Sequence, residues 1–306
     1  MRRISIQSFR SVDVNDPAPG MKAIAEAGFE ALDYGFDGYL SGRKISEGDF
    51  APFFTQTAER IIETQYPLKE AAKKYGVEIG QMHASFPLYV YGRDDINEKC
   101  FDVIDKTLAV AKFLDCPWVI IHPLNLIDKC GLEEERRINF GYYRRIMPLA
   151  AKHGVGVCLE NMFGWEIRHA LEATCSNFEE ANEYVDTLNR EAGGELFGFC
   201  YDTGHARLLN KRVYESLVLL GNNLKTLHIH ENDGWQDMHA MPYTYSCYFS
   251  ESPESMMNWG AFCRGLAKIG YKGNINFETS GSLAIFPKPT HNEVRALIAS
   301  CGRYFR

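Results

Sequence analysis

The chain has 306 residues, of which 45% are hydrophobic, and its 33 Lys and Arg against 40 Asp and Glu give a net charge of −7. This acidic balance, without a long run of Lys or Arg, disfavours a nucleic-acid partner and an anionic membrane surface. The length allows a large buried core, and no Pro/Ser-rich or Gly/Ser-rich stretch marks a linker. We therefore expect one domain over residues 1–306.

The N-terminal segment, from Met1 to Gln7, lacks the apolar run of about 7 to 15 residues that a signal peptide needs. No segment approaches the roughly 18 apolar residues that span a bilayer. The nine cysteines are scattered without a Cys-x-x-Cys pair, and Cys158 and Cys200 fall inside predicted strands. These features predict a soluble, cytoplasmic protein without a membrane partner, whose cysteines are buried thiols and not disulfides or zinc ligands.

Strand-like and helix-like segments alternate along the chain. In chain order, a strand at 4–9 precedes a helix at 17–27, and a strand at 31–36 precedes a helical stretch at 53–75 that Pro67 divides or kinks. The next pairs are 77–85 with 96–114, 118–122 with 133–153, and 155–160 with 177–192. The last pairs are 197–202 with 213–220, 224–230 with 256–269, and 274–278 with 292–301. Eight such repeats in about 300 residues predict an α/β fold, a closed (β/α)8 TIM barrel.

An open doubly wound sheet is the alternative α/β architecture. It carries its ligand at one crevice, which only a few strands reach. Here chemically active residues follow at least six strands, and a barrel brings all strand ends to one face. The sequence contains neither a Gly-x-Gly-x-x-Gly nor a Gly-x-x-x-x-Gly-Lys-Ser/Thr loop, so we expect no nucleotide cofactor.

Most of these strands end in residue types that bind metals or transfer protons. The residues are His83, His122, Glu160, Asp202 with the nearby His205, His230 and Glu278. A charge at the end of an apolar strand indicates a site, because burying it as packing is costly. We expect the metal ligands to be Glu160, Asp202, His230 and Glu278. Such an oxygen-rich set without sulfur suits a divalent ion, namely Mn, Mg, Co or Zn.

Two histidines compete for one place in this ligand set. His228 and His230 point to the same side of their strand, because side chains alternate, and His230 lies nearer the rim. We therefore expect His230 to be the ligand and His228 to be a hydrogen-bonded residue inside the barrel.

Five segments, in order along the chain, carry a family resemblance. They are Leu-Glu-Asn at 159–161, Asp-Thr-Gly-His-Ala at 202–206, His-Ile-His-Glu-Asn-Asp at 228–233, Asp-Met-His at 237–239 and Gly-Tyr-Lys-Gly at 270–273, ahead of Glu278. Together they resemble the xylose-isomerase-like TIM barrels, which include sugar phosphate isomerases and epimerases, ketose 3-epimerases and class II apurinic endonucleases. The resemblance spans essentially the whole chain and is strongest from residue 155 onward.

The resemblance to ketose 3-epimerases implies a mechanism. One metal would be held by the four ligands named above, with Glu160 and Glu278 on opposite faces of the bound sugar. One glutamate would remove the proton beside the carbonyl and the other would return it, through a metal-stabilised enediolate. His205 would contact the oxygens of the substrate. We therefore expect a metal-dependent sugar isomerase or epimerase of carbohydrate metabolism.

Two other functions are open. The nuclease branch implies a metal-dependent phosphodiesterase with three metals, and its nine ligands have counterparts here. They are His83, His122, Glu160, Asp202, His205, His230, Asp237, His239 and Glu278. The net acidic chain disfavours this reading, because a DNA-binding enzyme neutralises phosphates with clustered Lys and Arg. A non-catalytic sugar-binding protein or enzyme subunit that keeps the metal for structure is the third possibility.

Two loops depart from the usual family pattern. After Asp-Met-His the chain has an extended, aromatic loop at about 240–257 on the catalytic face, and the loop after Glu160 is aromatic too, with Trp165 in it. Such rings either stack on a sugar or bury against a neighbouring subunit of a homo-oligomer. The lack of a Gly-rich phosphate loop after the last strands favours a sugar or sugar derivative without phosphate.

Overall fold

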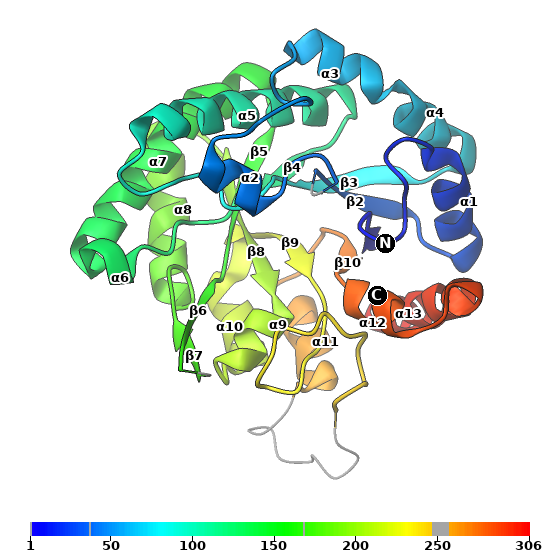
Figure 1. Ribbon diagram of the computed structural model, residues 1–306. Coiled ribbons are helices and arrows are strands. Elements are labelled where there is room, and N and C mark those ends of the chain that lie inside the picture. Colours follow the sequence, from blue (N-terminus) through cyan, green and yellow to red (C-terminus); the bar gives the residue numbers. More distant parts are fainter. Residues whose placement is uncertain (1, 37, 168, 247–256) are drawn as a thin grey trace.

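A computed structural model describes residues 2–36, 38–167, 169–246 and 257–306. Eight parallel strands form a barrel with helices around it (Figure 1). The strands, in spatial order, are β10 (Ile275–Phe277), β1 (Ile4–Gln7), β2 (Ala31–Gly35), β3 (Glu78–His83), β4 (Trp118–Ile120), β5 (Gly156–Glu160), β8 (Phe197–Asp202) and β9 (Leu224–His228). The predicted (β/α)8 barrel is confirmed.

The residues that follow β9 close the barrel. The Ile229 amide donates to the Asn276 carbonyl at 2.9 Å, and the Glu278 amide donates to the Ile229 carbonyl at 3.0 Å. These bonds link β9 to β10, so the sheet has no free edge. All six residues of β8 are buried, as expected of a strand that has the barrel interior on one side and helices on the other.

Helices follow most of the strands, close to the predicted positions. They are α1 (Pro17–Ala27), α2 (Gly42–Glu47), α3 (Ala58–Thr64), α4 (Tyr66–Tyr75), α5 (Asp94–Phe113), α6 (Ile127–Cys130), α7 (Leu132–His153), α8 (Phe178–Ala192), α9 (Thr203–Leu208), α10 (Val213–Leu220), α11 (Trp259–Lys268), α12 (Ser280–Ile285) and α13 (His291–Phe305). Pro67 lies in the first turn of α4, where its missing N–H costs nothing. The predicted stretch at 53–75 is therefore two helices, α3 and α4.

The aromatic loop expected after β5 is an antiparallel hairpin. Its strands are β6 (Phe163–Glu166) and β7 (His169–Glu172), and in Figure 1 the hairpin projects from the barrel below β5. The second expected loop, at 240–257, is described only in part, because residues 247–256 lie outside the described residues. At its start, Ala240 pairs with Glu231 through two backbone hydrogen bonds.

The cysteines in the described part of the chain are free thiols. Cys158 and Cys200 are buried, as predicted, and Cys247 lies outside the described residues. Among the described helices, none is both long and apolar enough to cross a membrane.

The close fit of α13 against the barrel leads to a stability prediction. A Cβ atom at Gly302 would lie 2.6 Å from Ile4 Cγ2 and 2.9 Å from Phe277 Cε2, and both neighbours are buried. We expect Gly302→Ala to destabilise the protein by about 1–3 kcal/mol through overpacking. The matched control is Gly141→Ala in α7, where a Cβ meets nothing within 4 Å. That change should stabilise the protein by about 0.5–1 kcal/mol. Thermal denaturation of both variants checks the pair, and equal melting midpoints would contradict it.

Candidate metal centre

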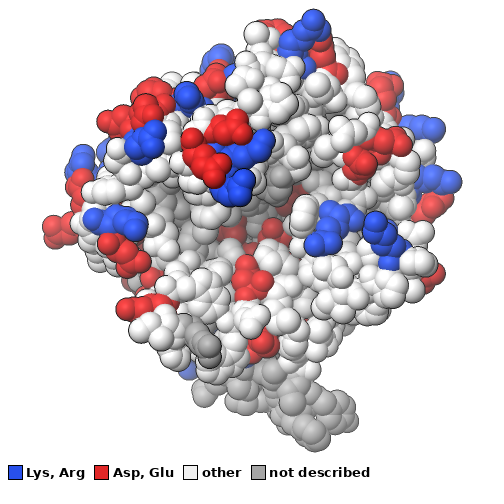
Figure 2. Space-filling view, viewed as in Figure 1, with Lys and Arg blue, Asp and Glu red and all other residues white. Residues whose placement is uncertain are grey.

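The residues with metal-binding side chains meet at the C-terminal mouth of the barrel. Glu160, Asp202 and His228 are the last residues of β5, β8 and β9, and Glu278 directly follows β10. Because the strands are parallel, their carboxyl ends open onto one face. Figure 2 shows Asp and Glu atoms inside a central hollow on the face that it displays.

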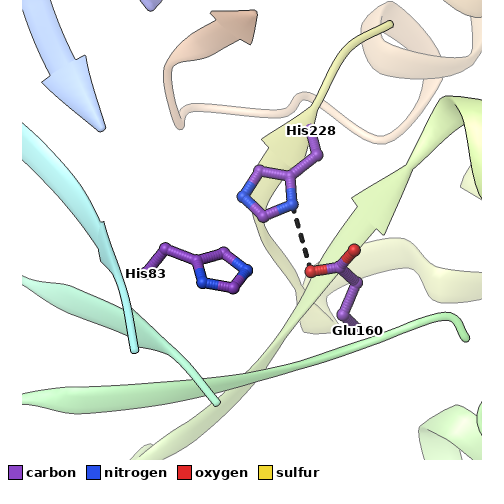
Figure 3. A group of neighbouring side chains, drawn as sticks. All are labelled: His83, Glu160 and His228. Carbon is purple, nitrogen blue, oxygen red and sulfur yellow. Dashed lines mark ion pairs between the residues drawn. The ribbon is translucent and has the colours of Figure 1, made fainter. Parts of the chain in front are cut away.

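His228 lies at the centre of this group. Its Nδ1 is 3.0 Å from Glu160 Oε2, 3.4 Å from Glu278 Oε2 and 4.0 Å from Asp202 Oδ2. Figure 3 shows the first of these contacts, with His83 beside it. The ring is fully buried, and neither of its nitrogens has a hydrogen-bond partner of good geometry. A buried imidazole nitrogen facing three carboxylates fits a divalent cation. His228 lies within ligand distance of a shared ion with His83 and Glu160 in one set, and with Asp202 and Glu278 in a second.

His230, the expected ligand, lies in an adjacent group. Its Nε2 is 3.0 Å from Asp202 Oδ2 and 3.7 Å from Asp237 Oδ1, and its ring stacks on His239 with 4.2 Å between centroids. The backbone explains this position, because β9 ends at His228 and the Thr203 hydroxyl bonds to both the N–H and the carbonyl of His230.

The preference for His230 over His228 is therefore not what the geometry favours. The expectation that both histidines point to one side of the strand holds. Yet only His228 is close to both glutamates, whereas His230 is close to Asp202 and Glu278 and not to Glu160. His228 is buried inside the barrel, as expected, but it belongs to the centre.

The remaining expected histidines surround the centre. His122 Nε2 lies 3.0 Å from both Glu160 Oε2 and His83 Nε2. His205 Nδ1 lies 3.3 Å from Glu160 Oε1. On the other side, His239 Nε2 lies 2.9 Å from Asp237 Oδ2, which is also 3.6 Å from His205 Nε2. The structure thus brings together nine of the ten expected residues.

The neighbours shift the pKa values of the buried acids. Burial works to raise the pKa of Glu160, but His228 and His122 outweigh it and hold the pKa well below its usual value. Burial likewise works against the ionised form of Asp202, but His205 and His230 lower its pKa. Both carboxylates are therefore ionised at neutral pH.

The same pairing raises the pKa values of two histidines, His228 and His239. Burial works to lower the pKa of His228, whereas Cys200 and Glu160 raise it, and the pKa lies well above its usual value. For His239, burial is outweighed by Glu278 and Asp237, which raise the pKa to about 10. In the absence of a cation, protons on these rings compensate the carboxylates. His122 differs, because burial lowers its pKa.

A cavity of about 640 Å³ opens next to the centre and is lined at its inner end by Glu160, His205 and Glu278. Its outer part is formed by aromatic and aliphatic side chains, which we call the apolar wall. The apolar residues are Phe86, Pro87, Tyr89, Leu124, Leu126, Met162, Phe163 and Trp165. No Lys or Arg in the described part of the chain lines it. Trp165, the tenth expected residue, belongs to this wall and is 48% exposed.

A larger cavity of about 870 Å³ lies at the opposite mouth of the barrel, where the strands begin. It is lined by Trp118 and Lys225 among others, and its lining contains no histidine. The centre described above is therefore the better candidate for chemistry.

Two residues of this region were missed in the sequence. Phe86 forms part of the cavity lining, but a single aromatic residue in a loop carries no distinctive signal. Asp33 is buried in β2 beneath His228. It could have been found, because an acid inside the apolar segment 31–36 is as costly as the acids that marked the later strands.

The fold and the centre define a class: a (β/α)8 barrel with buried histidines and carboxylates at the mouth where such barrels hold their active sites. The chain belongs to the xylose isomerase-like TIM barrel family, whose model matches residues 21–301. An uncharacterized protein of Sinorhizobium fredii, y4fM, is 24% identical over 266 residues, which cover 84% of this chain and 78% of that protein.

Solved structures show the same fold. The 3-keto-D-glucoside 4-epimerase YcjR from E. coli matches with a TM-score of 0.69 and 14% identity, over 98% of this chain and 100% of that chain. A D-psicose 3-epimerase matches with a TM-score of 0.67 and 13% identity, over 99% of each chain. A family 2 AP endonuclease from Brucella melitensis matches with a TM-score of 0.60 and 16% identity, over 91% of this chain and 93% of that chain.

Proposed function

We propose that this protein is a divalent-metal-dependent isomerase or epimerase of a sugar or sugar derivative. The observation that carries the proposal is the set of three carboxylates around His228 Nδ1 at the mouth of the barrel. The structural neighbours named as epimerases act on a 3-keto-D-glucoside and on D-psicose, which supports a sugar as the substrate class.

The two glutamates are the candidates for proton transfer. Both line the cavity, and both direct an oxygen towards His228. Glu160 is 1% exposed and ionised, so it can accept a proton from the carbon beside a sugar carbonyl. Gln7 Nε2 donates to Glu278 Oε1 at 3.3 Å, which leaves Glu278 Oε2 directed at the centre. When bound, a divalent cation supplies Lewis-acid polarisation of the carbonyl, which favours the enediolate.

The wall of the cavity favours a neutral substrate. A phosphorylated sugar would bring negative charge next to Glu160, Asp237 and Glu278 without a Lys or Arg in the described lining to neutralise it. Rings such as Trp165 and Phe163 present flat apolar faces, on which the C–H face of a sugar can stack. We propose a non-phosphorylated sugar derivative on these grounds.

A metal-dependent phosphodiesterase of the AP endonuclease type is the second candidate. It is favoured by four overlapping sets of metal-binding side chains in the described part of the chain, which together could hold more than one cation. They are His83, Glu160 and His228; Asp202, His205 and His230; His230, His239 and Glu278; and Asp202, His228 and Glu278. The same apolar wall counts against it, because a DNA backbone needs cationic neighbours.

Product analysis separates the candidates. We expect the Mn-loaded protein to convert at least one member of a panel of ketoses, aldoses, keto-glycosides and inositol-type ketones into an epimer or isomer, seen by NMR. An oligonucleotide with an abasic site, incubated in parallel, should stay intact. Cleavage of that oligonucleotide without sugar conversion would favour the phosphodiesterase. Sugar binding without conversion would favour a binding protein that keeps the metal for structure.

A further inference from the structure

A second buried carboxylate lies on the far side of the His228 ring from the centre. Asp33, in β2, is 2% exposed, and its Oδ2 is 3.2 Å from His228 Nε2. The His228 ring therefore separates two acidic groups, with Nδ1 facing the three carboxylates of the centre and Nε2 facing Asp33. Burying one more carboxylate beneath an already acidic centre is costly unless it has a specific partner.

The surroundings of Asp33 hold it in one orientation. Gln81 Nε2 from β3 and Asn276 Nδ2 from β10 each donate to Asp33 Oδ2 at 3.0 Å. Gln81 Nε2 also lies 3.3 Å from the carbonyl of Leu227, the residue before His228. The side chains of Asp33, Gln81 and Asn276 are buried, so β2, β3 and β10 contribute to one polar layer beneath the centre, together with the Leu227 carbonyl of β9. The two amide donors fix the position of Asp33 Oδ2, which lies within reach of the imidazole N–H of His228.

We infer that Asp33 is a positioning residue for the metal centre. With a cation on Nδ1, the Asp33 Oδ2 that lies 3.2 Å from His228 Nε2 would accept the Nε2–H and thereby direct the Nδ1 lone pair at the cation. The inference rests on the proposed metal dependence and deepens it. A histidine that ligates through one nitrogen generally donates its other N–H to an outer partner, which selects the tautomer and makes the ring a stronger ligand. Gln81 and Asn276 do not contact the centre in this role, but orient Asp33 through their hydrogen bonds to its Oδ2.

Metal affinity separates this role from a purely structural one. If Asp33 served only core packing, Asp33→Asn would lower the melting midpoint of the metal-free protein and leave the Kd for Mn²⁺ unchanged. A positioning residue weakens binding even in the folded fraction. We expect the Kd for Mn²⁺, measured by EPR of the free ion, to rise about 10- to 100-fold in Asp33→Asn.

The control removes a similar pair far from the centre. Asp105 Oδ1 lies 2.8 Å from His153 Nε2 between α5 and α7 on the outside of the barrel. Asp105→Asn should leave the Kd for Mn²⁺ unchanged. If Asp33→Asn does not fold, Gln81→Met, which removes one donor to Asp33, replaces it and should weaken Mn²⁺ binding several-fold.

The outcomes distinguish the two proposals. A Kd in Asp33→Asn, or in Gln81→Met if the first variant does not fold, equal to that of the unmodified protein would overturn the role of Asp33 and leave the proposed function standing. If the unmodified protein binds none of Mn²⁺, Co²⁺ or Zn²⁺, both proposals fail. Equal weakening in Asp33→Asn and Asp105→Asn would also overturn the inference, because the effect would then not be specific to the centre.

Discussion

Glu160→Gln is expected to lower turnover of the sugar substrate by about 10²- to 10⁴-fold, the contribution of a positioned general base. The amide keeps the size of the side chain but cannot accept a proton. Glu160 is buried, and His228 and His122 keep it ionised despite that burial, so the substitution removes a carboxylate that is able to accept a proton. The measurement is kcat at saturating Mn²⁺.

The matched control for this prediction is Glu166→Gln. Glu166 lies six residues further along the chain on the exposed end of the hairpin strand β6, and its substitution should leave kcat unchanged. Metal content is measured for both variants, since Glu160 is also a proposed ligand. Retention of more than about a tenth of kcat in fully loaded Glu160→Gln would show that Glu160 is not the base.

Metal removal is expected to abolish turnover and to make the stability of the protein depend on pH. The pKa of His239 is raised to about 10, and that of His228 is raised well above its usual value. A group whose pKa is raised by folding stabilises the folded state below its unfolded pKa, about 6.5 for histidine. That stabilisation is lost as the pH rises towards 10. The chelated protein should therefore melt at progressively lower temperature between about pH 6.5 and pH 10.

The same protons compete with the cation. Ligation of His228 through Nδ1 requires the loss of its proton, so the affinity for Mn²⁺ should increase as the pH rises. At a free concentration of 100 times the Kd, the metal should stabilise the folded protein by about 2.7 kcal/mol. The melting midpoint at alkaline pH should therefore be higher with the metal than without it. Differential scanning calorimetry with and without chelator tests this. A melting midpoint that is the same in both samples from pH 6.5 to 10 would contradict a metal at this centre.

The barrel could be predicted because its strands carry a simple signal. Apolar runs such as β5 and β8 end in an acid, and nearly all of their residues are buried. The strand boundaries differ from the prediction, since β4 and β10 have three residues each, whereas the sequence predicts strands at 118–122 and 274–278. Hydrogen bonding between neighbouring strands, which decides where a strand ends, depends on the register of the whole barrel.

The hairpin and the order of the histidines could not be predicted in the same way. The segment 163–172 has mostly exposed or half-buried residues, so no clear alternation marks its two strands. The choice between His228 and His230 depends in part on Thr203, which follows β8 and whose hydroxyl bonds to the backbone N–H and carbonyl of His230. Residue type predicted which side chains lie together at the barrel mouth, whereas the place of each one follows from contacts between distant segments.

Solvent deuterium exchange tests the central claim most directly. The Mn-loaded protein is incubated in D₂O with the same sugar panel, and isotope incorporation is followed by mass spectrometry. Our account predicts deuterium at a carbon beside the carbonyl of at least one sugar, lost on chelation and restored by adding Mn²⁺. No incorporation and no new product with any member of the panel would contradict enediolate chemistry at this centre.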